Sequence, residues 1–245
     1  MHHFNHCLLA CILAGSAPTL LAGSYIESRD ADDVRQRLYI DGPLARIESD
    51  DADEYVILDM QQHRYYSVND LEQQIVDMSS LLRKSTAAPK NSGVQFIKQG
   101  AGPKIGGYAT ERYRVVYKNT HCFDELLSVE ALKIPDLKRY YTAAQQMDVH
   151  DIVADAGADA PAMEGICAAA ASLLTEAHYA DLGVPMSALD TRGEVEHEIV
   201  QIVVNISFPA ETFQLPAEYE RVSIADVMRE SAHELLKDKA LSEPP

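Results

Sequence analysis

Two cysteines, Cys122 and Cys167, are the residues of this chain whose chemistry can be anticipated most directly. Cys7 and Cys11 lie in an apolar N-terminal leader, so the remainder of the chain carries this one pair. An even number of cysteines in an oxidising compartment is typical of a disulfide. We therefore predict a bridge between Cys122 and Cys167. The alternative is that Cys167, which lies in an apolar helical run, is a buried and inert thiol.

Other reactive side chains do not combine into a catalytic or metal site. His121 precedes Cys122, but adjacent residues rarely direct their side chains at each other. His197 lies between Glu196 and Glu198, and strand alternation places both carboxylates on the face opposite the imidazole. The chain has no G-x-S-x-G, H-E-x-x-H or Walker sequence. We expect a protein that is not an enzyme and that needs no cofactor and no metal.

The leader indicates export. Residues 7–23 carry no charged side chain and end in small residues, and the first charged side chain is Glu27. This pattern predicts a signal peptide over 1–23, followed by a single domain over 24–245 in the periplasm or outside the cell. Leu8 to Cys11 also resembles a lipobox, which would make an acylated Cys11 the first mature residue. We favour the signal peptide because the lipobox leaves too short an apolar stretch.

The net charge excludes two classes of partner. The formal net charge is −17, and all of the charged side chains follow the leader. Nucleic acids and anionic lipid headgroups are bound by surfaces rich in Lys and Arg. We therefore expect neither nucleic acid nor an anionic membrane surface as a partner, and no transmembrane span once the leader is removed.

The first half of the exported chain is typical of an antiparallel meander. Short β-branched or aromatic runs alternate with Asp-Gly-Pro, acidic and Asn-Asp turns. We predict strands over residues 36–41, 44–49, 54–60, 63–68 and 72–78, and a further pair over 94–99 and 111–118.

The second half adds helices and one long apolar strand. Helical periodicity predicts helices over 136–147, 161–181 and 223–237, with Gly183 ending the second. Strands are expected over 184–190 and 195–208. The strand over 195–208 is apolar on both faces, so we expect other parts of the chain to pack against both faces. We therefore predict an α+β fold: a curled antiparallel sheet, or half-barrel, with a helical insert packed on its concave face and an acidic C-terminal helix and tail.

An apolar pocket is expected between this sheet and the alanine-rich helix over 161–181, because alanine leaves space that a larger side chain would fill. The alternative is that alanine only permits close packing and that the interior is solid. The residues that we predict to line the pocket are Tyr113, Val115, Tyr117, Val200, Ile202 and Val204.

A resemblance to a known family rests on six short stretches: residues 42–47 (GPLARI), 55–59 (YVILD), 65–69 (YYSVN), 105–108 (IGGY), 113–115 (YRV) and 213–219 (FQLPAEY). Together they resemble an uncharacterised bacterial secreted family, domain of unknown function 4412, which has a LolA/LolB-like lipoprotein-carrier fold. The resemblance implies a concave apolar face that could hold an acyl chain or a partner's strand. It offers no catalytic residues to transfer.

These observations favour a periplasmic binding or carrier protein for an apolar, lipid-like ligand. The alternative function is an envelope protein that docks another protein through a sheet edge or its acidic surface and holds no small ligand.

The leader makes a first testable prediction. We expect the exported protein to be cleaved between Ala17 and Ser24 and to have no covalently attached acyl chain, because the uncharged tract ends in small residues suited to signal peptidase. N-terminal sequencing and intact-mass measurement of the exported chain test this. A mature chain that starts at a diacylated Cys11 would contradict it.

Overall fold

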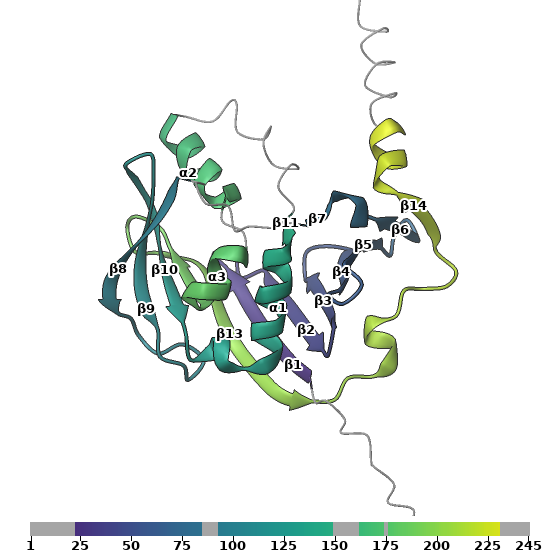
Figure 1. Cartoon of the computed structure of the whole chain (residues 1–245), viewed down its shortest axis with the longest axis horizontal. Coiled ribbons are helices and arrows are strands. Elements are labelled where there is room, and N and C mark those ends of the chain that lie inside the picture. The colour runs from purple at the N-terminus through teal and green to yellow at the C-terminus, as the bar shows by residue number, and fades with distance from the viewer. Residues whose placement is uncertain (1–22, 85–92, 149–161, 174–175, 231–245) are drawn as a thin grey trace, which may run out of the picture.

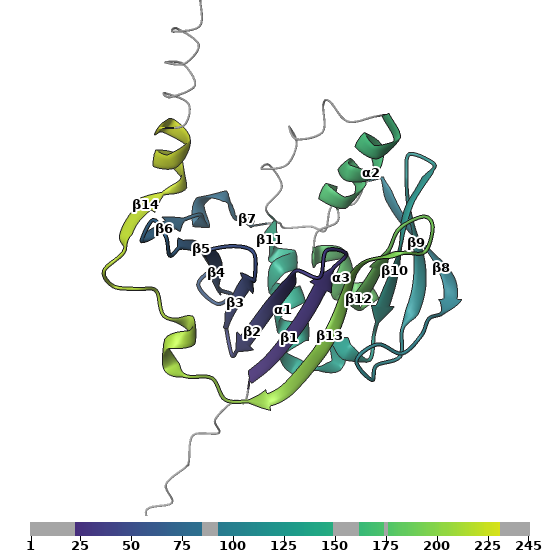
Figure 2. The ribbon, with the colours of Figure 1, turned by 180° about the vertical axis from the view of Figure 1, so that it is seen from behind.

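The computed structural model describes residues 23–84, 93–148, 162–173 and 176–230. Most of the predicted leader therefore lies outside the described residues. A twelve-stranded curled sheet dominates the fold, and helices cover one of its faces (Figures 1 and 2). This confirms the predicted α+β class. The main-sheet strands are β1 (Gly23–Asp30), β2 (Arg35–Asp41), β3 (Leu44–Ser49), β4 (Glu54–Asp59), β5 (Arg64–Asn69), β6 (Gln74–Asp77), β8 (Val94–Ala101), β9 (Glu111–Tyr117), β10 (Thr120–Ser128), β12 (Val184–Leu189), β13 (Val195–Ile206) and β14 (Glu220–Ser223).

The strand order is β14-β6-β5-β4-β3-β2-β1-β13-β12-β10-β9-β8. Neighbouring strands are antiparallel except β14 and β6, which are parallel. The predicted meander is confirmed from β2 to β6. The pairing of β1 with β13 then joins the meander to the second half of the sheet. A separate two-stranded sheet pairs β7 (Arg83–Lys84) with β11 (Met147–Asp148).

Two central strands, β1 and β10, were not predicted from the sequence. In β1 the buried side chains include Ser24 and Ser28 as well as Ile26, so the inward face is not marked by large apolar residues. In β10 the buried residues include Asp124 and Glu125. Cys122 is also part of this strand. Buried polar residues conceal the apolar alternation by which strands are recognised.

The helices lie on one side of the sheet (Figures 1 and 2). They are α1 (Pro135–Gln146), α2 (Ala162–Leu173) and α3 (Glu176–Leu182), and short 3-10 turns lie at Ser79–Leu81, Ala131–Lys133 and Ala210–Phe213. The predicted helix over 161–181 thus appears as α2 and α3, separated by residues 174–175, which are outside the description. Residues 224–230 are helical, as predicted, and 231–237 are not described. No helix in the described ranges is long and apolar enough to cross a membrane.

Gly183 ends α3, as predicted. Its amide donates to the carbonyl of Tyr179 at 2.9 Å, and its φ is +130°, which favours glycine. A Cβ at this position would lie 2.8 Å from the carbonyl carbon of Ser128. The close approach brings the end of α3 against β10.

The principal core lies between the middle of the sheet and α1. Ile26, Ile40 and Leu58 pack from the strands, and Leu137 and Tyr141 from the helix. Near the start of the helix, the Ser24 hydroxyl donates to a carboxylate oxygen of Asp136 at 2.8 Å in a buried hydrogen bond. This bond satisfies two buried polar groups and attaches α1 to β1.

A second, smaller core lies on the other face of β4, β5 and β6. It consists of Tyr55, Ile57, Tyr66, Val68 and Ile75. Leu215 and Tyr219, from the segment that leads to β14, pack against this cluster. Both faces of the meander are therefore covered, but by different parts of the chain.

Candidate ligand-binding site

Two adjoining pockets lie on the helix-covered side of the sheet, and Tyr179 of α3 lines both of them. The first has a volume of about 290 Å³ and the second about 380 Å³. Sites for small molecules typically span about 300–1,000 Å³. Each pocket is therefore close to the lower end of this range, and the two meet at Tyr179.

The first pocket is mainly apolar. Its floor comes from β1, β2, β3 and β13, and Tyr140 and Tyr141 of α1 form part of its wall. The tyrosine rings contact each other edge to face at 5.3 Å between centroids, which fixes their orientation. The lining residues are Ile26, Ser28, Gln36, Arg37, Leu38, Ile47, Tyr140, Tyr141, Tyr179, Pro185, His197 and Ile199.

His197 contributes an imidazole to the first pocket. Burial lowers the pKa of this side chain, while the nearby Asp30 and Glu198 carboxylates oppose the shift. The imidazole therefore favours the neutral form. A neutral ring can accept or donate a hydrogen bond without adding a charge to an apolar site.

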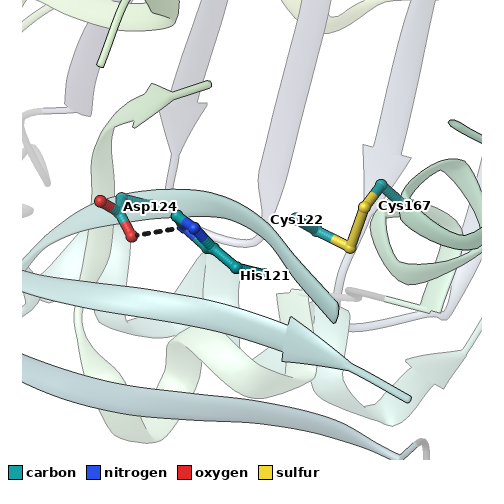
Figure 3. The surroundings of a disulfide bond; sticks show 4 residues. All are labelled: His121, Cys122, Asp124 and Cys167. Carbon is teal, nitrogen blue, oxygen red and sulfur yellow. Dashed lines mark hydrogen bonds and ion pairs between the residues drawn. A yellow bond between two sulfur atoms is a disulfide. The ribbon is translucent and has the colours of Figure 1, made fainter. Parts of the chain in front are cut away.

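The second pocket lies between β10, α2 and the start of β13. Its lining residues are Cys122, Phe123, Glu125, Cys167, Ala168, Ala171, Tyr179, Ala188 and Glu196. The predicted disulfide is formed here: the Sγ atoms of Cys122 and Cys167 are bonded, and the Cα atoms are 5.1 Å apart. Figure 3 shows this bond joining Cys122 on the strand to Cys167 on the neighbouring helix. The disulfide is therefore part of the pocket wall as well as the attachment of α2.

Glu125 is the polar residue buried in the second pocket. It is only 5% exposed, and the Tyr179 hydroxyl donates to its Oε1 at 3.1 Å. Its Oε2 is buried and has no hydrogen-bond partner in the described part of the chain. Burial raises the pKa of this carboxyl to about 7; the Tyr179 hydroxyl opposes the shift, and the charge of Glu196 adds to it. Glu125 therefore changes charge near neutral pH.

Asp124, the neighbouring residue, shows the opposite arrangement. Arg112 Nε donates to its Oδ2 at 2.8 Å, and His121 Nε2 lies 3.0 Å from its Oδ1 (Figure 3). Arg114 lies 3.8 Å from the same carboxylate. Consecutive strand residues point to opposite faces. The available cations therefore bind Asp124 on one face of β10, while Glu125 faces the helices.

None of the six predicted lining residues lines either of the two pockets. Tyr113 and Val115 pair across β9 and β10 with Glu125 and Phe123, so they share the face of the second pocket. Val115 is fully buried, and the Tyr113 hydroxyl donates to Glu111 at 2.9 Å. Tyr117 lies further along β9, with Lys118 Nζ 5.1 Å from its ring centre. None of the three lines a described pocket.

The prediction for β13 needs a correction. Glu27 pairs with Gln201 and Ser28 with Ile199, so Val200 is the extra residue of a β-bulge. The bulge shifts the alternation, and Val200 and Val204 are 40% and 39% exposed. Ile202 is partly buried against the principal core, while Ile199 lines the first pocket. Ile202 and Val204 pair with Ile26 and Ser24 and stay on one face, so the bulge removes only Val200 from the predicted common face.

Sequence reasoning missed Glu125 and the residues of β1, β2 and α1 around the first pocket. The sequence pattern that could have revealed Glu125 is an acidic residue directly before Leu126 and Leu127, because a carboxylate in an apolar run is rarely buried unless it has a partner. In the described part of the chain, no cluster of three His, Cys, Asp or Glu side chains could hold a metal ion.

No protein-family model and no curated protein matches this chain. Solved structures that resemble it include an uncharacterized conserved protein from Thermus thermophilus, with 9% identity and a TM-score of 0.40 over 83% of this chain and 91% of that one. MucB aligns at 12% identity and a TM-score of 0.38, over 81% of this chain and 57% of its own. A chain of the Pseudomonas aeruginosa MucA/MucB complex aligns at 12% and 0.38, over 83% and 58%. These similarities are too distant to show a family or a function, so membership of the domain-of-unknown-function family stays a prediction.

A matched pair of substitutions on α2 tests whether the second pocket is open. Ala170 is fully buried, so Ala170→Leu should overpack the core and lower the free energy of unfolding by about 1–3 kcal/mol. Ala171 is exposed and lines the pocket, so Ala171→Leu should change it by less than about 0.5 kcal/mol. Urea unfolding without reductant measures both. Equal, large losses would mean that the space beneath α2 is filled.

Glu125 predicts a specific dependence of stability on pH. Between its ordinary pKa of 4.5 and its folded pKa of about 7, the folded protein binds more protons at this site than the unfolded chain does. Raising the pH through this window therefore destabilises the fold, by on the order of 3 kcal/mol in total. Glu125→Gln removes this term, so the stability of the variant relative to wild type should increase from pH 5 to pH 8. A difference that stays constant over this range would contradict the burial of a titrating carboxyl.

Proposed function

We propose that this protein is a non-catalytic binding protein of the periplasm or cell exterior that holds an apolar, lipid-like ligand between its curled sheet and helices α1 and α3. The observation that carries the proposal is the first pocket, which is lined by aliphatic and tyrosine side chains from both halves of the sheet. An alkyl chain gains about 0.8 kcal/mol for each methylene that it buries in such a site. The polar residues of its lining, Ser28, Gln36, Arg37 and His197, can orient a ligand.

The proposed location outside the cytoplasm is supported by two features. The disulfide between Cys122 and Cys167 is typical of an oxidising compartment, and the uncharged tract over residues 7–23 is typical of an export signal. A binding protein in this compartment would meet lipid-like molecules in an aqueous phase, where an apolar pocket can shield them from water.

A second candidate is docking of another protein at the edge of the sheet. β8 is the last strand at its end of the sheet order, and Ile97 in this strand is 44% exposed. An edge strand presents backbone N–H and C=O groups that a partner's strand can pair with. Recovery of a stoichiometric protein partner on the wild-type protein, with no bound amphiphile, would favour this function over the first.

A series of linear alcohols from six to fourteen carbons tests the proposed function. We expect the affinity to rise about fourfold for each added methylene until the pocket is full, and then to level off. Displacement of N-phenyl-1-naphthylamine fluorescence from the full exported chain measures this. Ser28→Leu, which places four carbons in the first pocket, should weaken every member of the series, whereas Ser207→Leu at an exposed position should not. Alcohols that do not bind, or bind without any dependence on length, would refute the pocket as an apolar site.

A further inference from the structure

The buried carboxyl of Glu125 has half of its hydrogen-bonding capacity unused. Oε1 accepts the bond from Tyr179, and Oε2 has no partner among the described residues. A buried polar atom without a partner costs about 1–3 kcal/mol. The cost is avoidable, because an apolar side chain such as leucine has no polar atom to leave without a partner. An unsatisfied carboxyl in a pocket therefore suggests that its partner comes from outside the chain.

The surroundings of Glu125 define the charge of that partner. The described lining of the second pocket contains a second carboxylate, Glu196, and no Lys, Arg or His. Arg112 and Arg114 lie on the adjacent strand but bind Asp124 on the other face. The remaining lining is alanine, phenylalanine, tyrosine and the disulfide. Two carboxylates in an otherwise apolar pocket favour a cation and disfavour an anion.

We propose that the second pocket binds the ammonium group of an amphiphilic ligand, with Glu125 as its ion-pair partner, while the ligand's alkyl chain lies in the first pocket. This inference rests on the proposed function. Tyr179 lines both pockets, so a ligand that occupies both would contact its side chain. The terminal torsion of a glutamate side chain is broad, so a small rotation brings either carboxylate oxygen to the ligand.

An organic ammonium fits this site better than a metal ion or an alcohol. A metal ion needs more ligands than the described acids provide, since no described cluster of three metal-ligating side chains exists. An alcohol can donate one hydrogen bond to Glu125 but leaves the buried charge uncompensated. A primary ammonium donates charge-assisted hydrogen bonds and neutralises the carboxylate at the same time.

The protonation of Glu125 should also make the affinity of the site for an ammonium group depend on pH. With a pKa of about 7, Glu125 is partly protonated near neutrality. The other described titratable groups near it are Tyr179 from α3, Glu196 from β13 and Tyr113, which pairs with it from β9; the cysteines of the disulfide do not titrate. An alkylammonium stays charged below about pH 10. Its affinity should therefore increase between pH 6 and pH 8, as Glu125 loses its proton.

Isothermal titration calorimetry with decylamine and decanol tests the inference. The full exported chain is used at about 150 mM salt, which screens the diffuse attraction of a protein with a net charge of −17. At pH 8 we expect wild type to bind decylamine at least about tenfold more tightly than decanol. Glu125→Gln should abolish this preference and its pH dependence. Glu220→Gln, an exposed substitution with the same change in charge on β14, should have no effect.

The outcomes separate this inference from the proposed function. If decanol binds with the expected dependence on chain length and decylamine binds no better, the ammonium site is refuted and the apolar pocket stands. A decylamine preference that survives Glu125→Gln would assign the attraction to the general negative charge and also refute the site. If neither compound binds a correctly folded wild type, both proposals fail. Tighter binding of decanoate than of decylamine would overturn the assigned charge.

Discussion

The antiparallel pairing of β1 with β13 is the contact on which the rest of the structure depends. It extends from Gly23 opposite Ile206 to Asp30 opposite His197, and so joins segments that are far apart in the chain. One side of this pair carries the meander β2 to β6, and the other carries β12, β10, β9 and β8. The first pocket lies across the junction, with Ile26 from β1 and Ile199 from β13. Without this pairing, each half of the sheet would keep only part of the pocket floor.

The bulge at Val200 adapts this junction to the helices. A regular twelve-residue strand would present every second side chain to the same face. The extra residue directs Ile199 and Ile202 toward the covered side and leaves Val200 exposed. Bulges also increase the local twist of a sheet. The same irregularity therefore accounts for both the position of the pocket floor and part of the curl that surrounds α1 and α3.

β10 separates two kinds of acidic residue by strand alternation alone. Asp124 has Arg112, Arg114 and His121 around it, so its charge is compensated within the protein. Glu125, one residue later, accepts a hydrogen bond from a single tyrosine hydroxyl, and burial raises the pKa of its carboxyl. Asp124 therefore belongs to a structural ion pair, whereas Glu125 is a group that an external cation can stabilise. The disulfide holds α2 over Glu125 and so maintains the low-dielectric surroundings that raise the pKa of this carboxyl.

The meander, the helical regions and the disulfide pair can be predicted from the amino-acid sequence, because they follow from local patterns. Alternating runs such as residues 54–60, the helical period over 136–147 and a single remaining cysteine pair can each be recognised within a short window. The places of β1 and β10, the face of Val200 in β13 and the residues of both pockets follow from the three-dimensional arrangement instead. These depend on pairings between distant segments and on one bulge, which no local window contains. Buried acids such as Glu125 break the local pattern for the same reason: their surroundings are assembled by strands and helices from other parts of the chain.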